Sequence, residues 1–216
     1  MKLWAKLCDR ALADPWQMFT IIGNGPYCAV SYDSATLYDL HFYMEQLGHK
    51  LHRQDPDEFL LSAPNNGFRY INLVTKFPLR EKISQQLDKH STSRFSFFAS
   101  YIPQSKNIGH GVFVYPGVNI YPSVKIGSDV IIHSGSTIGH NSIIGQNTFI
   151  SGNTSLAGSV KVGKCCWVGV DALIIDNVSV ANYTTINARS LVIKDIVDEN
   201  STYKKHVKHV DHNGDQ

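Results

Sequence analysis

The chain has 216 residues, 18% of them charged, and a formal net charge of +2. A charge this close to neutral gives no support for a nucleic-acid partner, and no apolar run is long enough to cross a membrane. We therefore expect no membrane insertion. The four cysteines show no metal-ligand spacing, and we expect a protein of the reducing cytoplasm.

Residues 1–17 form an N-terminal extension without the apolar stretch and cleavage site of a signal peptide. Residues 18–100 then alternate between strand and helix patterns, in which short apolar runs predict strands and apolar residues at helical spacing predict helices. This alternation is typical of a small parallel α/β domain of the Rossmann-like type. The predicted elements are a strand at 19–22, a helix at 35–47, a strand at 69–74, a helix at 78–89 and a strand at 95–98.

A glycine-containing turn, Gly23-Asn24-Gly25-Pro26, follows the first predicted strand. In a parallel α/β sheet such a turn can hold a phosphate, because backbone N–H groups and a helix N-terminus converge there. The alternative is a tight turn that needs glycine only for its backbone conformation. Both interpretations fit the sequence, and Gly23, Asn24 and Gly25 are the predicted contacts if a phosphate binds.

A six-residue repeat fills residues 101–196. This period fits neither a helix nor a simple strand, and it is typical of a coil with three short flat sides that each bury one aliphatic residue. Three such sides make 18 residues per coil, so about five coils are expected to stack. The sixteen aliphatic positions are Ile102, Ile108, Val114, Ile120, Ile126, Ile132, Ile138, Ile144, Ile150, Leu156, Val162, Val168, Ile174, Val180, Ile186 and Val192.

A second register, four residues after the aliphatic one, holds small or β-branched residues that fit where the coil turns. Cys166 occupies this register, so we expect a buried structural thiol. Beyond the repeat, residues 197–216 form a polar tail that contains Lys204 and Lys205.

Together the two halves resemble the hexapeptide-repeat sugar acetyltransferases of the PglD and NeuD type, over roughly residues 18–195. Besides the hexad repeat, the resemblance rests on the strand and turn from Phe19 to Gly25, the segment from Tyr70 to Ile83 and the bridge from Phe97 to Pro103. It implies that the repeat forms a left-handed parallel β-helix, an exception to the usual right-handed crossover. It also implies a homotrimer that binds acetyl-CoA between subunits, with the N-terminal domain holding the nucleotide of a sugar substrate.

The resemblance assigns catalysis to His140, which follows Ile138 by two residues. Gly158 has the same position one coil later, where it would leave space beside the imidazole and an unshielded N–H for a thioester oxygen as negative charge develops. The resemblance gives Gly158 that role and makes His140 the general base. The acidic residue that usually follows the histidine is Asn141 here, an amide that can orient the ring but cannot neutralise its charge. The alternative is a surface histidine on a turn.

Further contacts are predicted around this pair. Lys76, Arg80 and His133 are expected to contact the substrate, and Lys204 and Lys205 to contact the CoA phosphates, although a solvated tail is the alternative for the two lysines. A metal site is not expected, because the spacings of His110, His133 and His140 put them on different sides or registers of the coil.

The predicted reaction is the transfer of an acetyl group from acetyl-CoA to the amine of a nucleotide-linked amino sugar in bacterial glycan biosynthesis, by direct attack. Two alternatives stay open. One is O-acetylation of a sialic-acid-type sugar, since no local feature separates an amine from a hydroxyl. The other is a catalytically lapsed sugar-nucleotide-binding protein, which the loss of the acidic neighbour of His140 would permit.

Overall fold

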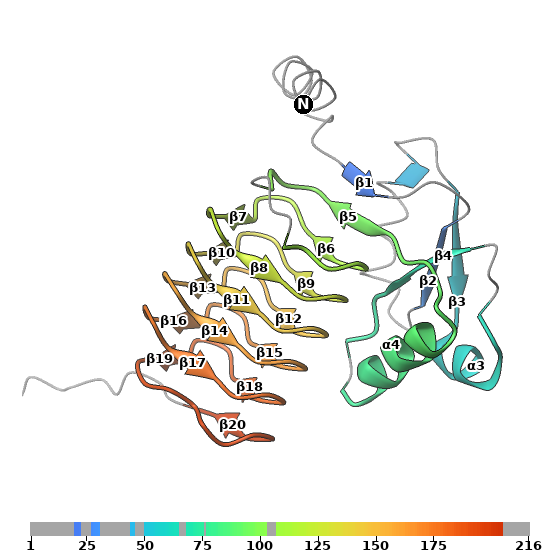
Figure 1. Ribbon diagram of the computed structural model, residues 1–216. Helices are drawn as coiled ribbons and strands as arrows, with labels where there is room; N and C mark the ends of the chain where they lie inside the picture. The colour runs from blue at the N-terminus through green and yellow to red at the C-terminus, as the bar shows by residue number, and fades with distance from the viewer. Residues whose placement is uncertain are drawn as a thin grey trace, which may run out of the picture.

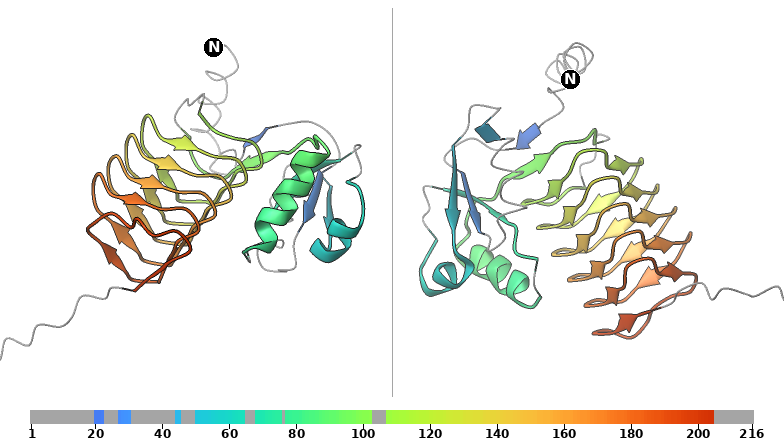
Figure 2. Two further views of the ribbon diagram at one scale, coloured as in Figure 1. Left: turned by 60° about the horizontal axis from the view of Figure 1, so that its bottom comes forward. Right: turned by 180° about the vertical axis from the view of Figure 1, so that it is seen from behind.

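The fold combines a parallel β-helix with a smaller region of strands and helices that lies beside it (Figure 1). The structure is a computed structural model that describes residues 20–22, 27–30, 44–45, 50–64, 68–75, 77–102 and 107–204. Two further views show that the helices of the smaller region lie alongside the coils rather than at their far end (Figure 2).

The β-helix has three sides, each a parallel sheet of two-residue strands. The first side consists of β6 (Phe113–Val114), β9 (Ile131–Ile132), β12 (Phe149–Ile150), β15 (Trp167–Val168), β18 (Thr185–Ile186) and β20 (Thr202–Tyr203). The second consists of β7 (Asn119–Ile120), β10 (Thr137–Ile138), β13 (Ser155–Leu156), β16 (Leu173–Ile174) and β19 (Leu191–Val192). The third consists of β8 (Lys125–Ile126), β11 (Ile143–Ile144), β14 (Lys161–Val162) and β17 (Ser179–Val180).

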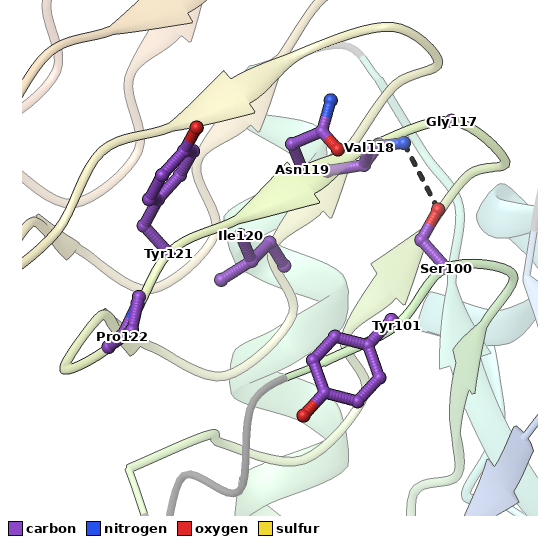
Figure 3. A pocket seen from close by; sticks show the side chains of 8 residues that line it. All are labelled: Ser100, Tyr101, Gly117, Val118, Asn119, Ile120, Tyr121 and Pro122. Carbon is purple, nitrogen blue, oxygen red and sulfur yellow. Dashed lines mark hydrogen bonds between the residues drawn. The ribbon is translucent and has the colours of Figure 1, made fainter. Parts of the chain in front are cut away.

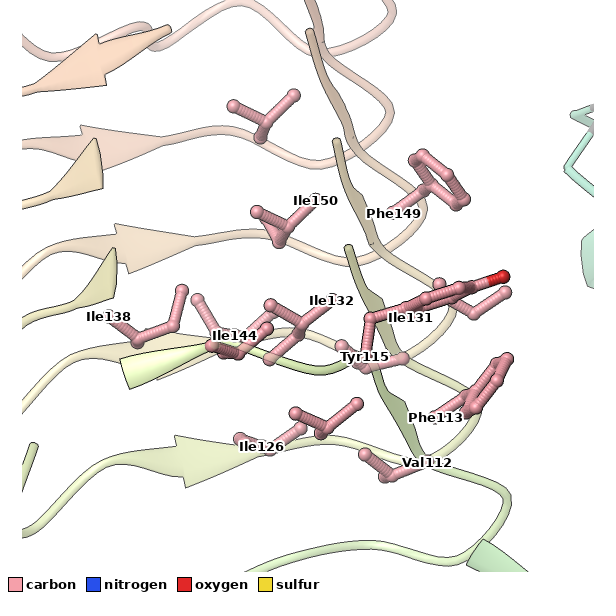
Figure 4. Close-up of a cluster of buried hydrophobic side chains, with 14 of the residues drawn as sticks. Val112, Phe113, Tyr115, Ile126, Ile131, Ile132, Ile138, Ile144, Phe149 and Ile150 are labelled. Carbon is pink, nitrogen blue, oxygen red and sulfur yellow. The ribbon is translucent and has the colours of Figure 1, made fainter. Parts of the chain in front are cut away.

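The aliphatic register fills the interior of the coils, as the repeat predicts. Paired residues lie 18 positions apart, for example Ile138 with Leu156, and both side chains are buried. Burying one such side chain contributes roughly 1.5–3 kcal/mol, and the hexad repeats that gain along the whole β-helix. Figure 4 shows part of this interior, with Ile126, Ile132, Ile138, Ile144 and Ile150.

Cys166 is a fully buried free thiol, as its register predicts. Its Sγ donates to the carbonyl oxygen of Ala181 at 3.1 Å. Burial raises the pKa of the Cys166 thiol to about 11, because the thiolate would lose its hydration inside the coil.

The smaller region contains a parallel sheet of three strands in the order β3-β2-β4, formed by Leu51–Gln54, Tyr27–Val30 and Arg69–Asn72. The helices α3 (Pro56–Leu61) and α4 (Leu79–Lys89) accompany it. Asp55 caps α3, since its Oδ1 accepts from the N–H of Asp57 at 2.9 Å. The predicted strand at 69–74 and helix at 78–89 are confirmed, whereas β2, β3 and α3 were not predicted.

The first and last predicted strands of this region do not belong to its parallel sheet. β1 (Thr20–Ile22) pairs antiparallel with β5 (Ser96–Phe98), and β5 pairs in parallel with β6 of the β-helix. The prediction that 19–22 opens the parallel sheet is therefore wrong, because a short apolar run does not reveal its partner. These two strands instead cover the exposed edge of the first coil. Of the helix predicted at 35–47, only residues 44–45 are described, and they are helical.

Candidate functional site

His140 lies at the corner between the second and third sides, in the turn that joins β10 to β11. The backbone of this turn is fixed from both neighbouring coils. The N–H of Asn141 donates to the carbonyl oxygen of Pro122 at 3.1 Å, and the carbonyl oxygen of His140 accepts from the N–H of Ser159 at 2.8 Å. The exposed imidazole therefore stands on a rigid part of the β-helix rather than on a free loop.

Asn141 contacts the catalytic candidate directly. Its φ of 60° puts it in the left-handed region, where asparagine is among the best tolerated residues. In this conformation its Nδ2 lies 3.2 Å from Nδ1 of His140. An amide in this place can hold one ring nitrogen and leave Nε2 free to exchange a proton with a substrate.

Gly158 lies against the imidazole from the next coil. A Cβ built at this glycine would come within 2.7 Å of both Cε1 and Nε2 of His140. No real side chain tolerates such contacts, so only glycine permits this position of the ring. The missing side chain of Gly158 thus leaves room for the imidazole.

The N–H of Gly158 already has a hydrogen-bond acceptor, whereas the prediction left it unshielded. It donates to Oδ1 of Asp176 at 2.7 Å. Asp176 lies 18 residues after Gly158, so it belongs to the same column of stacked corner residues as His140. Asp176 was not predicted, although its register in the repeat places it in this column.

A hollow of about 440 Å³ adjoins this corner on the side of the first coil (Figure 3). Its wall is tied to the turn of His140, since the N–H of Tyr121 donates to the carbonyl oxygen of Ile138 at 3.0 Å. Tyr101 and Tyr121 are exposed at its edge and give it two phenol groups. The hollow is lined by Ser100, Tyr101, Gly117, Val118, Asn119, Ile120, Tyr121 and Pro122.

Arg80 is not placed to contact a substrate, contrary to the prediction, because it has no exposed surface. It is fully buried at the start of α4, where its guanidinium donates to four backbone carbonyl oxygens. Loss of hydration lowers its pKa to about 10. The acceptors belong to Asn72, Val74, Asp129 and Asn147, so Arg80 joins the N-terminal region to the corners of two coils.

His133 and His140 lie at different corners of the β-helix. His133 follows β9 on the first side, and its half-buried ring stacks on Tyr115 with 4.0 Å between ring centroids. The structure therefore does not bring His133 to the turn of His140. Lys204 follows β20 in the last coil and is also remote from that turn within one chain. Gly23, Asn24, Gly25, Lys76 and Lys205 lie outside the described residues.

The described part of the chain contains no group of three or more histidine, cysteine or carboxylate side chains placed to hold a metal ion. It also contains no helix long and apolar enough to cross a membrane.

Comparisons with known proteins agree with this architecture. Residues 105–140 match the family described as bacterial transferase hexapeptide (six repeats). No curated protein matches the chain.

Several solved structures are similar over most of the chain. PerB from Caulobacter crescentus, in complex with CoA and GDP-perosamine, is 23% identical with a TM-score of 0.66 over 83% of this chain and 93% of that one. The acetyltransferase domain of PglB from Neisseria gonorrhoeae FA1090, in complex with acetyl coenzyme A, is 16% identical with a TM-score of 0.69 over 84% and 97%. A mutant of perosamine N-acetyltransferase from Caulobacter crescentus, in complex with CoA and GDP-perosamine, is 18% identical with a TM-score of 0.52 over 85% and 93%. The matched repeat and the shared fold confirm the predicted left-handed hexapeptide-repeat β-helix.

Proposed function

We propose that this chain transfers an acetyl group from acetyl-CoA to the amine of a nucleotide-linked amino sugar, with His140 as general base. The observation that carries the proposal is the imidazole of His140, fixed at a β-helix corner by Asn141 on one side and against Gly158 on the other. Structures of the same fold are solved with CoA and GDP-perosamine, or with acetyl coenzyme A, which supports this class of donor and acceptor.

The chemistry needs one proton carrier. The acceptor amine attacks the thioester carbonyl carbon, and Nε2 of His140 takes the proton that the nitrogen loses as the C–N bond forms. Collapse of the tetrahedral intermediate breaks the C–S bond, and the same nitrogen returns the proton to the departing thiolate. The products are the N-acetylated sugar and CoA in its thiol form, with His140 neutral again.

We also propose a homotrimer, as the family resemblance implies. Three aliphatic side chains are each about 40% exposed in the single chain: Leu173 on the second side, and Ile175 and Ile193 at the corner between the second and third sides. These aliphatic side chains share the corner and side of His140. Contact with a second copy would bury them and would form a cleft beside the imidazole. Light scattering checks the assembly, and a monomer at micromolar concentration would contradict it.

The test of function is an acetylation assay on the purified chain. Acetyl-CoA is incubated with UDP-, dTDP-, GDP- and CMP-linked amino sugars, while free CoA is followed by a thiol reagent and the products by mass spectrometry. His140→Ala should lower turnover by about two to four orders of magnitude with unchanged melting behaviour. Wild-type turnover in that variant would show that His140 is not the base. An alkali-labile product on a sialic-acid-type sugar would indicate O-acetylation, and substrate binding without any transfer would indicate a lapsed enzyme.

A further inference from the structure

The hydrogen bond between Gly158 and Asp176 occupies a position that the proposed reaction needs. A backbone N–H carries one hydrogen, and that of Gly158 is directed at Oδ1 of Asp176 at 2.7 Å. The carboxylate is also near the imidazole. The point where a Cβ of Gly158 would lie is 2.7 Å from Nε2 of His140 and 3.2 Å from that same carboxylate oxygen. A base, a hydrogen-bond donor and a negative charge thus surround one position beside Gly158.

A carboxylate is not required there for folding, as the same chain demonstrates at another corner. The N–H of Lys164 donates to Oδ1 of Asn182, 18 residues later, at 2.9 Å. The two bonds have the same register, with each side chain satisfying the N–H of the equivalent residue one coil earlier. Asparagine therefore meets the structural need, and the negative charge of Asp176 is additional to it.

We infer that Asp176 holds the place of the donor's thioester oxygen and must leave it when acetyl-CoA binds. The inference rests on the proposed function. The N–H of Gly158 cannot serve a carboxylate and a carbonyl oxygen at once, and a carboxylate left beside the carbonyl would repel the charge that develops in the transition state. Asp176 is exposed, so its side chain can turn into solvent without disturbing the interior. Asp176 is thus a positioning residue that sets the affinity for the acyl group of the donor.

The test compares two ligands that differ only in that acyl group. Calorimetry measures the affinity of the full-length chain for acetyl-CoA and for CoA, which has the same phosphates but no thioester oxygen. In Asp176→Ala the ratio of acetyl-CoA affinity to CoA affinity should rise roughly threefold to tenfold, the effect of one freed hydrogen bond. Asp176→Asn keeps an acceptor without the charge, and its ratio should lie between those of the wild type and the alanine variant.

Asn182→Ala is the matched control, because it frees the N–H of Lys164 at a corner without a catalytic candidate. It should leave the ratio unchanged, so any general effect of a lost corner bond is subtracted. An unchanged or lower ratio in Asp176→Ala, in a chain that still melts like Asn182→Ala, would overturn the inference. If the wild type binds acetyl-CoA and acetylates a sugar nucleotide, but the affinity ratio is the same in the wild type and in Asp176→Ala, only this inference fails. If the wild type does not bind acetyl-CoA at all, the proposed function itself fails.

Discussion

Nε of Arg80 donates to the backbone carbonyl oxygen of Asn147 at 3.2 Å, which ties the first turn of α4 to a corner of the β-helix. The same corner is held a second time, because Oγ of Ser84 donates to Oδ1 of Asn147 at 2.6 Å. Asn72 completes this buried network by donating to Oγ of Ser84 at 2.9 Å. The N-terminal region is thus fixed to the β-helix by polar groups that water cannot reach.

Replacing Arg80 should damage folding rather than substrate binding. Arg80→Ala leaves four buried carbonyl oxygens without their donor and should lower the free energy of unfolding by about 3–5 kcal/mol. Chemical denaturation measures the change. Lys82→Ala, at an exposed position of the same helix, is the control and should change it by less than about 0.5 kcal/mol. If Arg80→Ala were as stable as the wild type but lost affinity for a sugar nucleotide, a role in substrate binding would be restored.

The buried thiol of Cys166 should make the protein less stable in alkali. Its pKa is raised to about 11 in the folded chain from an ordinary value of 9.0. The unfolded chain therefore loses this proton at a lower pH than the folded chain, so the contribution of the neutral thiol to the free energy of unfolding is complete below pH 9 and is lost as the pH rises through 11. The loss amounts to at most about 3 kcal/mol. Unfolding free energies measured between pH 8 and 11 should fall less steeply in Cys166→Ala, which keeps a small residue in the same register. Equal slopes in the two proteins would contradict this account.

The hexad repeat made most of the β-helix predictable. From Val114 onward every aliphatic position is buried, so the period alone indicates which side of the chain faces the interior, and Ile138 opposite Leu156 follows by counting 18 residues. The strand at 19–22 had no such repeat, and its antiparallel pairing with β5 depends on partners that local patterning does not reveal.

The candidate site was predictable in part for the same reason. Counting along the column placed Gly158 beside His140, and the same count would have placed Asp176 above Gly158. Arg80 was different, because an arginine near a helix start has no sequence signal that distinguishes a substrate contact from a buried bond to distant carbonyl groups. Full burial of a charged residue is rare enough that exposure is the usual expectation.

Asn141 allows its backbone and side-chain roles to be separated. Asn141→Gly keeps the left-handed φ of 60° at no steric cost but removes the amide next to Nδ1 of His140. We expect stability within about 1 kcal/mol of the wild type and a turnover about tenfold lower, because the ring loses its orienting contact. Asn177→Gly is the control at the equivalent turn position two coils later, where φ is 63°. Equal turnover in the two variants would show that Asn141 has no orienting role.

Gly158→Ala should impair the reaction more than the fold. Its Cβ would meet the far end of the His140 side chain, which can turn into solvent, and the displaced ring would lower turnover by roughly one to two orders of magnitude. Gly139→Ala is the contrasting variant, because its Cβ would lie 2.4 Å from the backbone of Ala157, which cannot move, so it should destabilise the protein strongly.

A double-mutant cycle by chemical denaturation then isolates the contact with the imidazole. Any stability lost in Gly158→Ala should be recovered when His140→Ala is added, because the clashing ring is gone. If the free energy of unfolding stays low in the double variant, the strain lies in the backbone of Gly158 rather than in its contact with His140.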